Sequence, residues 1–167
     1  MSALSGPGAN LLSMTAPGIP SLALAPQRIS RRRFWRRFGR LEHERLEFKR
    51  SPVALQESVV AMSMHAGGVI LVGVADDRTL TGAPLDQAAV DRIAFVAHET
   101  GVALEVRALE VAATPVLMIR VPRVRDRVVT TSDGRILRRL GSANQPLRGD
   151  AVTRFVLARC GPARVSY

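Results

Sequence analysis

The sequence predicts an α+β domain with a mixed β-sheet and two to three helices packed on it, a single compact domain. Three observations support this class. Strand-like and helix-like hydrophobic patterns alternate along residues 41–160. VILVGVA, at residues 69–75, has the length and apolarity of a central strand covered on both faces. The chain has 167 residues, of which 47% are hydrophobic and 23% charged, enough for one ordinary core.

The expected order of elements is β-α-β-α-β-β-β-β-α. RLEFKR, at residues 45–50, alternates apolar and charged side chains and predicts a half-buried strand. Ser51 and Pro52 fit the N-cap and first position of a helix that ends at Gly67-Gly68. The apolar strand VILVGVA follows, and residues 76–82 turn the chain.

A second helix is expected over residues 86–99, with Asp86 as its N-cap and Gly101 as its stop. Strands at 102–110 and 115–122 come next. VVTT and RILRRL then flank Ser132-Asp133-Gly134, which predicts a hairpin. The last helix is expected to start near Asp150 and to bury three apolar side chains: Val152, Phe155 and Val156.

The ends of the chain differ in composition from its middle. Residues 1–27 are rich in Gly, Pro, Ser and Ala and predict a disordered leader. Residues 28–40, RISRRRFWRRFGR, form an arginine- and aromatic-rich arm; residues 41–160 form the compact domain, and 161–167 a short tail. Residues 1–41 hold seven arginines and no acid, within a net charge of +10, which favours a polyanionic partner.

The basic arm allows three interpretations. It can grip phosphates and stack on bases, it can dock its aromatic rings on the domain behind it, or it can lie on an anionic membrane. For the first interpretation the nucleic-acid-binding residues are Arg31, Arg32, Arg33, Trp35, Arg36 and Arg37.

Compartment and anchoring follow from what the sequence contains. No apolar run reaches the roughly 20 residues of a transmembrane segment. The single cysteine, Cys160, excludes an internal disulfide framework, and the leader lacks the charged start of a secretory signal. We expect a cytoplasmic protein; an acid-free leader before arginines also resembles an organellar transit peptide.

Three stretches together resemble the Schlafen-type AlbA domain family. They are LEHERLEFKRS, AMSMHAGGVILVGVADDRTLTG and ILRRLGSANQP, in the order and spacing of that family's signatures. The resemblance covers roughly residues 41–160 and implies a nucleic-acid-binding fold. In some Schlafen proteins it is also a metal-dependent endoribonuclease that acts on structured RNA such as tRNA.

The resemblance implies a carboxylate site at Glu42, Glu47 and Asp76, with Asp77 as the alternative to Asp76. These residues would be catalytic and would hold Mg²⁺ or Mn²⁺ if the domain is catalytic. Glu42 and Glu47 are five residues apart, so they can meet only if the chain bends between them. The alternative is that Glu47 pairs with Lys49 or an arginine while the aspartates only turn the chain.

Further contacts to nucleic acid are expected from Arg45, Lys49, Arg139 and Ser142, the last two because a Gly-Ser turn after an arginine-bearing strand suits a phosphate. Where the family usually has Asn, this chain has Met64. No ATP is expected, because a P-loop needs Gly-Lys-Ser/Thr and the chain has one lysine.

These observations lead to one functional hypothesis with one rival. The first is nucleic-acid binding, with RNA favoured and DNA as the other substrate, and with an endoribonuclease site. The rival is a non-catalytic DNA-binding or regulatory module. A single domain of this type could also form a homodimer to complete a groove.

Overall fold

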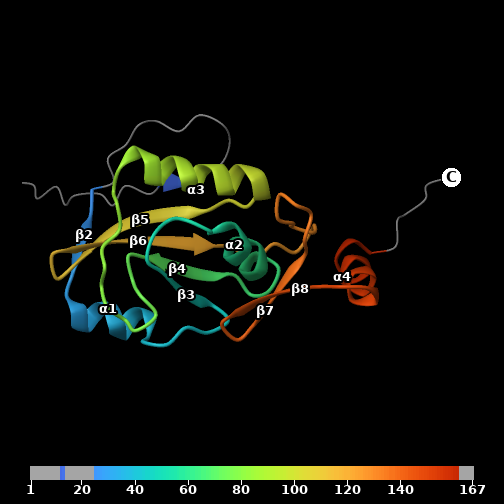
Figure 1. Cartoon of the computed structure of the whole chain (residues 1–167), viewed down its shortest axis with the longest axis horizontal. Coiled ribbons are helices and arrows are strands. Elements are labelled where there is room, and N and C mark those ends of the chain that lie inside the picture. Colours follow the sequence, from blue (N-terminus) through green and yellow to red (C-terminus); the bar gives the residue numbers. More distant parts are fainter. Residues whose placement is uncertain (1–11, 14–24, 162–167) are drawn as a thin grey trace, which may run out of the picture.

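The structure is a computed structural model that describes residues 12–13 and 25–161. These residues form a six-stranded sheet, a separate hairpin and four helices (Figure 1). The sheet contains β1 (Leu12–Ser13), β2 (Gln27–Ile29), β3 (Leu46–Lys49), β4 (Gly68–Val72), β5 (Glu105–Val111) and β6 (Thr114–Val121). The hairpin is β7 (Leu137–Leu140) and β8 (Ala143–Pro146). The helices are α1 (Arg31–Phe38), α2 (Gln56–Ser63), α3 (Gln87–Thr100) and α4 (Asp150–Cys160).

The sheet is mixed, which confirms the predicted α+β class. Its order is β1-β5-β6-β4-β3; β3 runs parallel to β4, while β4 and β5 are both antiparallel to β6. β2 pairs in parallel with β5, on which β1 also pairs. β3 therefore lies at one end of the sheet, beside the β7–β8 hairpin in Figure 1.

Each face of the sheet has its own hydrophobic core. Ile70 and Val72 of β4 pack with α2 and α3 on one face, and Leu71 packs with α1 on the other. This alternation follows from the two-residue period of a strand. The prediction that VILVGVA is a central strand covered on both faces is confirmed.

The arginine-rich arm belongs to the fold. Ser30 caps α1 by accepting a hydrogen bond from the Arg33 N–H at 3.3 Å. Phe34 is fully buried and Trp35 is 9% exposed; the Trp35 ring meets the Phe48 ring edge-on, with 6.0 Å between centroids. The aromatic rings of this arm therefore dock on the domain behind it, as one of the three interpretations expected, while its arginines stay exposed.

The glycine pair after α2 allows two chain segments to approach closely. Gly67 has φ +70°, and its N–H donates to the Met62 carbonyl at 2.8 Å. A Cβ at Gly68 would lie 2.4 Å from the Arg45 carbonyl oxygen, on the chain just before β3. Glycine at 68 thus lets β4 begin directly beside β3.

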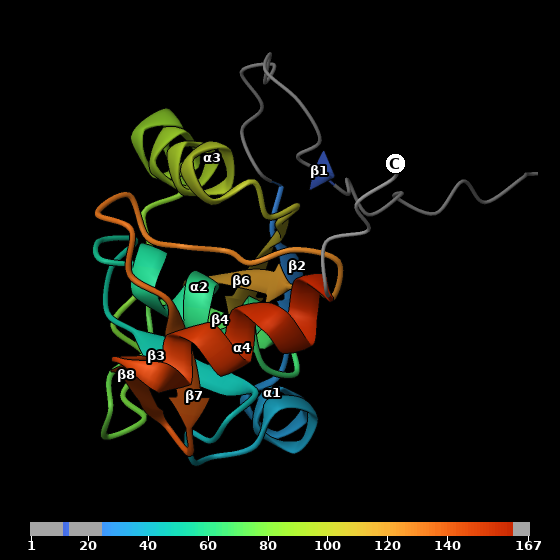
Figure 2. The same cartoon turned by 90° about the vertical axis from the view of Figure 1, so that its right-hand side faces the viewer.

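Several local predictions are corrected. α2 begins at Gln56, so Ser51 and Pro52 do not form its start. The turn at Ser132-Asp133-Gly134 exists, but β7 pairs with β8 across Gly141-Ser142 instead of with VVTT. α4 starts at Asp150 as expected, yet none of its side chains is fully buried, and it lies along the side of the body (Figure 2).

The helix predicted over residues 86–99 forms as expected, whereas the described part of the predicted leader differs from expectation. Asp86 caps α3 by accepting from the Ala89 N–H at 2.9 Å, and Gly101 ends it with φ +64°, both as predicted. Most of the predicted leader, residues 1–11 and 14–24, lies outside the described residues, as do 162–167 of the tail. Within the leader, Leu12–Ser13 and Gln27 form strand pairs where disorder was expected.

Candidate functional site

The chain turns back on itself between the first two predicted carboxylates. His43 and Leu46 exchange two backbone hydrogen bonds of 3.1 Å, which closes a tight turn before β3. Glu42 is thereby folded back along β3, where its Oε1 accepts the Phe48 N–H at 2.7 Å. The bend that lets Glu42 approach Glu47 is present.

Glu47 lies on β3 in a buried ion-pair network. Its Oε2 lies 2.5 Å from a terminal guanidinium nitrogen of Arg139, and its Oε1 lies 2.9 Å from both the Lys49 ammonium and the Ser58 hydroxyl. The Arg139 side chain has 0% exposure and also donates to Asn144 Oδ1 at 2.6 Å. Both oxygens of Glu47 therefore already have protein partners.

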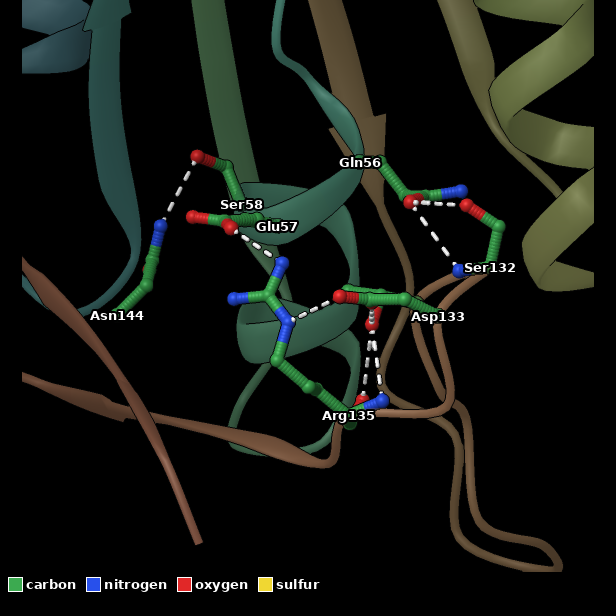
Figure 3. A network of polar contacts seen from close by, with 8 residues as sticks. Gln56, Glu57, Ser58, Ser132, Asp133, Arg135 and Asn144 are labelled. Atoms are coloured by element: carbon green, nitrogen blue, oxygen red, sulfur yellow. Dashed lines mark hydrogen bonds and ion pairs between the residues drawn. The ribbon is translucent and has the colours of Figure 1, made fainter.

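The network ties the hairpin to the body. Asn144 of β8 donates to the Ser58 hydroxyl of α2 at 3.2 Å (Figure 3). Arg135, just before β7, forms ion pairs of 2.7 Å with both Glu57 of α2 and Asp133 (Figure 3). The contacts of Asn144 with Ser58 and of Arg135 with Glu57 both end on α2, so polar side chains hold the hairpin against the body.

Arg139, predicted to contact nucleic acid, has protein partners in this geometry. Its guanidinium is buried and donates to the Leu46 and His43 carbonyls at 3.4 and 3.2 Å. Its contact to a phosphate stays a prediction, which would require the side chain to leave these partners. Arg138, its exposed neighbour on β7, points to the other face, as strand alternation requires.

Asp76 completes the predicted carboxylate set from the loop after β4. Its side chain is exposed, and its negative charge and that of Glu47 raise the pKa of Glu42. Burial is the largest cause of that raised pKa, while the Phe48 N–H and the Arg139 charge oppose it. Asp77 instead accepts the Thr79 N–H at 2.9 Å, which lowers its pKa and fits a turn residue.

The carboxylates as arranged fit a divalent metal poorly. Within residues 12–13 and 25–161, no three His, Cys, Asp or Glu side chains lie close enough to hold a metal ion. Glu47 is neutralised by Arg139 and Lys49, and one oxygen of Glu42 is used by the backbone of Phe48. A metal ligand needs free oxygens, so Glu47 would have to leave both cations first.

The remaining predicted contacts lie at β3 and in the β7–β8 turn. Arg45 and Ser142 are exposed, and Lys49 is half-buried beside Glu47. Met64, at the position where the family usually has Asn, is buried, and its sulfur accepts the Val129 N–H at 3.3 Å. His65 lies 3.1 Å from Glu44 at the surface. Met64 thus takes a structural hydrogen bond in the loop behind the sheet.

The largest group of predicted contacts lies on α1. With Phe34 and Trp35 turned into the core, the helix presents a row of exposed arginines: Arg31, Arg32, Arg33, Arg36, Arg37 and, just beyond its end, Arg40. The Trp35 ring is packed against Phe34 and Phe48, so base stacking by Trp35 would require it to leave this packing. The contact of the exposed arginines to nucleic acid stays a prediction.

Shallow hollows flank this helix on both sides. One, of about 510 Å³, is lined by Arg31, Arg32, Trp35, Arg36, Gly39 and Arg40. The other, of about 250 Å³, lies towards β2 and is lined by Gln27, Arg28, Ile29, Arg33, Arg36 and Arg37. We call the six exposed arginines of α1 and its C-terminal end, Arg31, Arg32, Arg33, Arg36, Arg37 and Arg40, the α1 arginine face.

Sequence reasoning missed four residues of these sites. Arg40 belongs to the α1 arginine face, and Arg28 lines the neighbouring hollow while paired with Glu110 at 3.1 Å; a simple extension of the basic run would have found both. Ser58 and Asn144 join the Glu47 network only through the fold. Nothing in their local sequence signals that role, because their partners lie 11 and 86 residues away.

Comparison with known proteins agrees with this fold. The family described as "Schlafen, AlbA_2" matches residues 42–148. The crystal structure of the DIP2311 protein from Corynebacterium diphtheriae has a TM-score of 0.55 and 20% identity to this chain, and covers 71% of it. This chain spans 28% of the DIP2311 chain. The chain has no match among the curated proteins.

Proposed function

Because the chain belongs to the Schlafen AlbA_2 family, a membership that suggests nucleic-acid binding, we propose that it binds the phosphate backbone of nucleic acid through the α1 arginine face. The observation that carries the proposal is the orientation of α1. Its aromatic side chains anchor it to the sheet, and six arginines face solvent on a surface with hollows on both flanks. Guanidinium groups pair with phosphate oxygens through two parallel hydrogen bonds.

The same orientation argues against the other partners considered for this arm. An amphipathic helix binds a membrane by inserting its apolar face, and here that face is already buried against β3 and β5. None of the helices in residues 25–161 combines the length and apolarity that crossing a bilayer requires. Single-strand binders stack bases on exposed aromatic rings, whereas Trp35 faces inward. Backbone contact to a structured nucleic acid is the remaining mode.

Structured RNA is the substrate we propose first, from the family resemblance, with duplex DNA as the alternative. The contacts of α1 are to phosphates, so we expect little dependence on base sequence. Arg45, exposed just before β3, is a further basic residue that we propose contacts the backbone.

The test is the affinity of labelled RNA hairpins and DNA duplexes for Arg32→Ala/Arg36→Ala, two arginines on one flank of α1. We expect uniform weakening, about tenfold or more, across sequences. The matched control is Arg92→Ala/Arg138→Ala, which removes the same charge from exposed positions on α3 and β7. Equal weakening by both double variants would show that net charge alone drives binding and would defeat the proposal.

Metal-dependent cleavage is the second candidate function. One observation favours it: burial first, and then the charges of Glu47 and Asp76, raise the pKa of Glu42, so these two carboxylates lie near that of Glu42. It requires Glu47 to exchange Arg139 and Lys49 for a metal, so we rank it below binding. Incubating labelled tRNA with Mn²⁺, Mg²⁺ or EDTA separates the two: cutting that needs metal and that Asp76→Asn abolishes establishes the site, and its absence with intact binding removes it.

A further inference from the structure

A second group of arginines lies at the far end of β6 from α1. After β6 the chain continues extended through Pro122, and Val124 points inward, buried, with its N–H donating to the Ser63 carbonyl at 2.9 Å. Arg123 and Arg125 are exposed on either side of Val124. Side chains two apart in an extended segment point to the same side, so both arginines face outward together.

Arg159, in the last turn of α4, is fixed beside them. Its two terminal nitrogens donate to the carbonyls of Val124 and Met64, and its guanidinium lies 5.0 Å from the centre of the Phe155 ring. Burial, and then the nearby charges of Arg123 and Arg125, lower the pKa of Arg159. Three guanidinium groups therefore meet where the β6 extension contacts α4.

This charge is not neutralised by the described part of the chain. Neither Arg123 nor Arg125 has an ion-pair partner within residues 12–13 and 25–161. Asp126 is adjacent in sequence but makes no such pair there either. Like charges held together at a surface are destabilising unless an anion joins them.

We propose that Arg123, Arg125 and Arg159 form a second phosphate-binding site, the α4 arginine site, used for a second contact to nucleic acid. The choice of nucleic acid as ligand rests on the proposed function; the phosphate chemistry rests on the three guanidinium groups. Arg159 supplies a fixed group, and Arg123 and Arg125 supply exposed forks that can close on phosphate oxygens.

The two arginine surfaces are separated by the length of β6. The β5–β6 turn, at Ala112 and Ala113, shares a hollow with Arg28 and Arg33 beside α1. The α4 arginine site follows the opposite end of β6, and Figure 1 likewise shows α1 and α4 at opposite ends of the molecule. An eight-residue strand spans about 26 Å, which corresponds to about 8 base pairs of duplex.

The experiment compares Arg123→Gln/Arg125→Gln with Arg92→Gln/Arg138→Gln, which removes the same charge elsewhere. Arg159 is left intact because it also holds α4. Affinity is measured for duplexes of about 6 and about 16 base pairs, shorter and longer than the separation. We expect the first variant to weaken the binding of the long duplex about tenfold and that of the short duplex little. Where the wild type binds two short duplexes, one at each surface, we expect the variant to bind one. No effect at either length, or an effect equal to the control's, overturns the site.

A second readout separates this inference from the proposed function. Titration with inorganic phosphate is followed by NMR of the arginine side-chain Nε–H signals. Phosphate-dependent shifts at Arg123, Arg125 and Arg159 in the wild type, with the Arg159 shift lost in Arg123→Gln/Arg125→Gln and with no nucleic-acid binding, would keep the site and remove the proposed function. Nucleic-acid binding that depends on α1, with no phosphate shift at these three residues, would do the reverse.

Discussion

At the scale of single residues, the glutamates of the family signature make structural contacts at the edge of the sheet. β4 bonds to β3 through the Arg45 and Lys49 carbonyls, so Leu46 and Phe48 direct their backbone groups to the free side. Glu42 accepts the Phe48 N–H there, and Arg139 donates to the Leu46 carbonyl. An open strand edge invites pairing with other chains, and these side chains occupy it.

The buried pair of Glu47 and Arg139 gives the first prediction. Arg139→Met removes the partner of Glu47 Oε2 and leaves the buried carboxylate with Lys49 as its one cation and with the Ser58 hydroxyl, so we expect a loss of about 3–5 kcal/mol in the free energy of unfolding. Arg138→Met, at the exposed neighbouring position, is expected to stay within about 0.5 kcal/mol of the wild type. Urea denaturation measures both. Similar costs for the two variants would mean that the pair does not hold the hairpin.

Glu42 gives a prediction in pH. Because its pKa is raised above 4.5 in the folded chain, folding binds a proton there, and this stabilisation is lost as pH rises from 4.5 through the folded pKa. Glu42→Gln removes the titration and keeps an oxygen to accept the Phe48 N–H. We expect the variant to gain stability relative to wild type as pH rises across this window, and then to level off. If the variant instead loses stability relative to wild type as pH rises across this window, the raised pKa is contradicted.

At the scale of elements, the sequence predicts those whose signals are local. α3 has its cap at Asp86 and its stop at Gly101 in adjacent sequence, and β4 is a continuous apolar run; both form where expected. The hairpin was misplaced because Ser132-Asp133-Gly134 and Gly141-Ser142 are both good turns. What decides between them is the docking of Arg135 on Glu57 and of Asn144 on Ser58, contacts between distant parts of the chain.

For the candidate site too, features with local sequence signals could be predicted, and features that depend on distant partners could not. The exposed arginines of α1 could be predicted from the run RRRFWRRF, because charges face water wherever the helix docks. The inward orientation of Trp35 depends on its packing against Phe48 and the rest of the core on that face of the sheet. The burial of Arg139 depends on its ion pair with Glu47 and on the turn at His43. A local pattern carries no information on these partners.

α1 gives a prediction that separates backbone contact from base stacking. Trp35 is the only tryptophan, and its ring is buried, so its emission maximum and its quenching by acrylamide should be unchanged when nucleic acid binds. The comparison variant is Trp35→Phe/Arg40→Trp, which moves the only tryptophan to the exposed α1 arginine face, where binding should quench it. Quenching of Trp35 in the wild type by single strands would indicate that α1 turns outward to stack on bases.

At the scale of the whole molecule, charge is segregated along the sheet. The α1 arginine face lies at one end, the α4 arginine site at the other, and the carboxylates near β3 are largely paired within the protein. If both proposed arginine surfaces bind phosphate, a partner long enough to reach both gains affinity, because the second contact forms at a high effective concentration. The proposal therefore attributes binding to two local clusters within the net charge of +10.

Salt dependence tests that description. Each phosphate neutralised on duplex DNA contributes about −0.9 to the slope of log affinity against log salt, so six arginines of α1 give about −5 and nine give about −8. We expect the shallower slope on duplexes of about 6 base pairs and the steeper one on about 16, because only the longer duplex spans β6. Arg123→Gln/Arg125→Gln should bring the long-duplex slope back to about −6. A slope that is the same at both lengths would mean that each duplex contacts one surface only. A stoichiometry of two duplexes per protein would then show that the other surface binds a separate duplex.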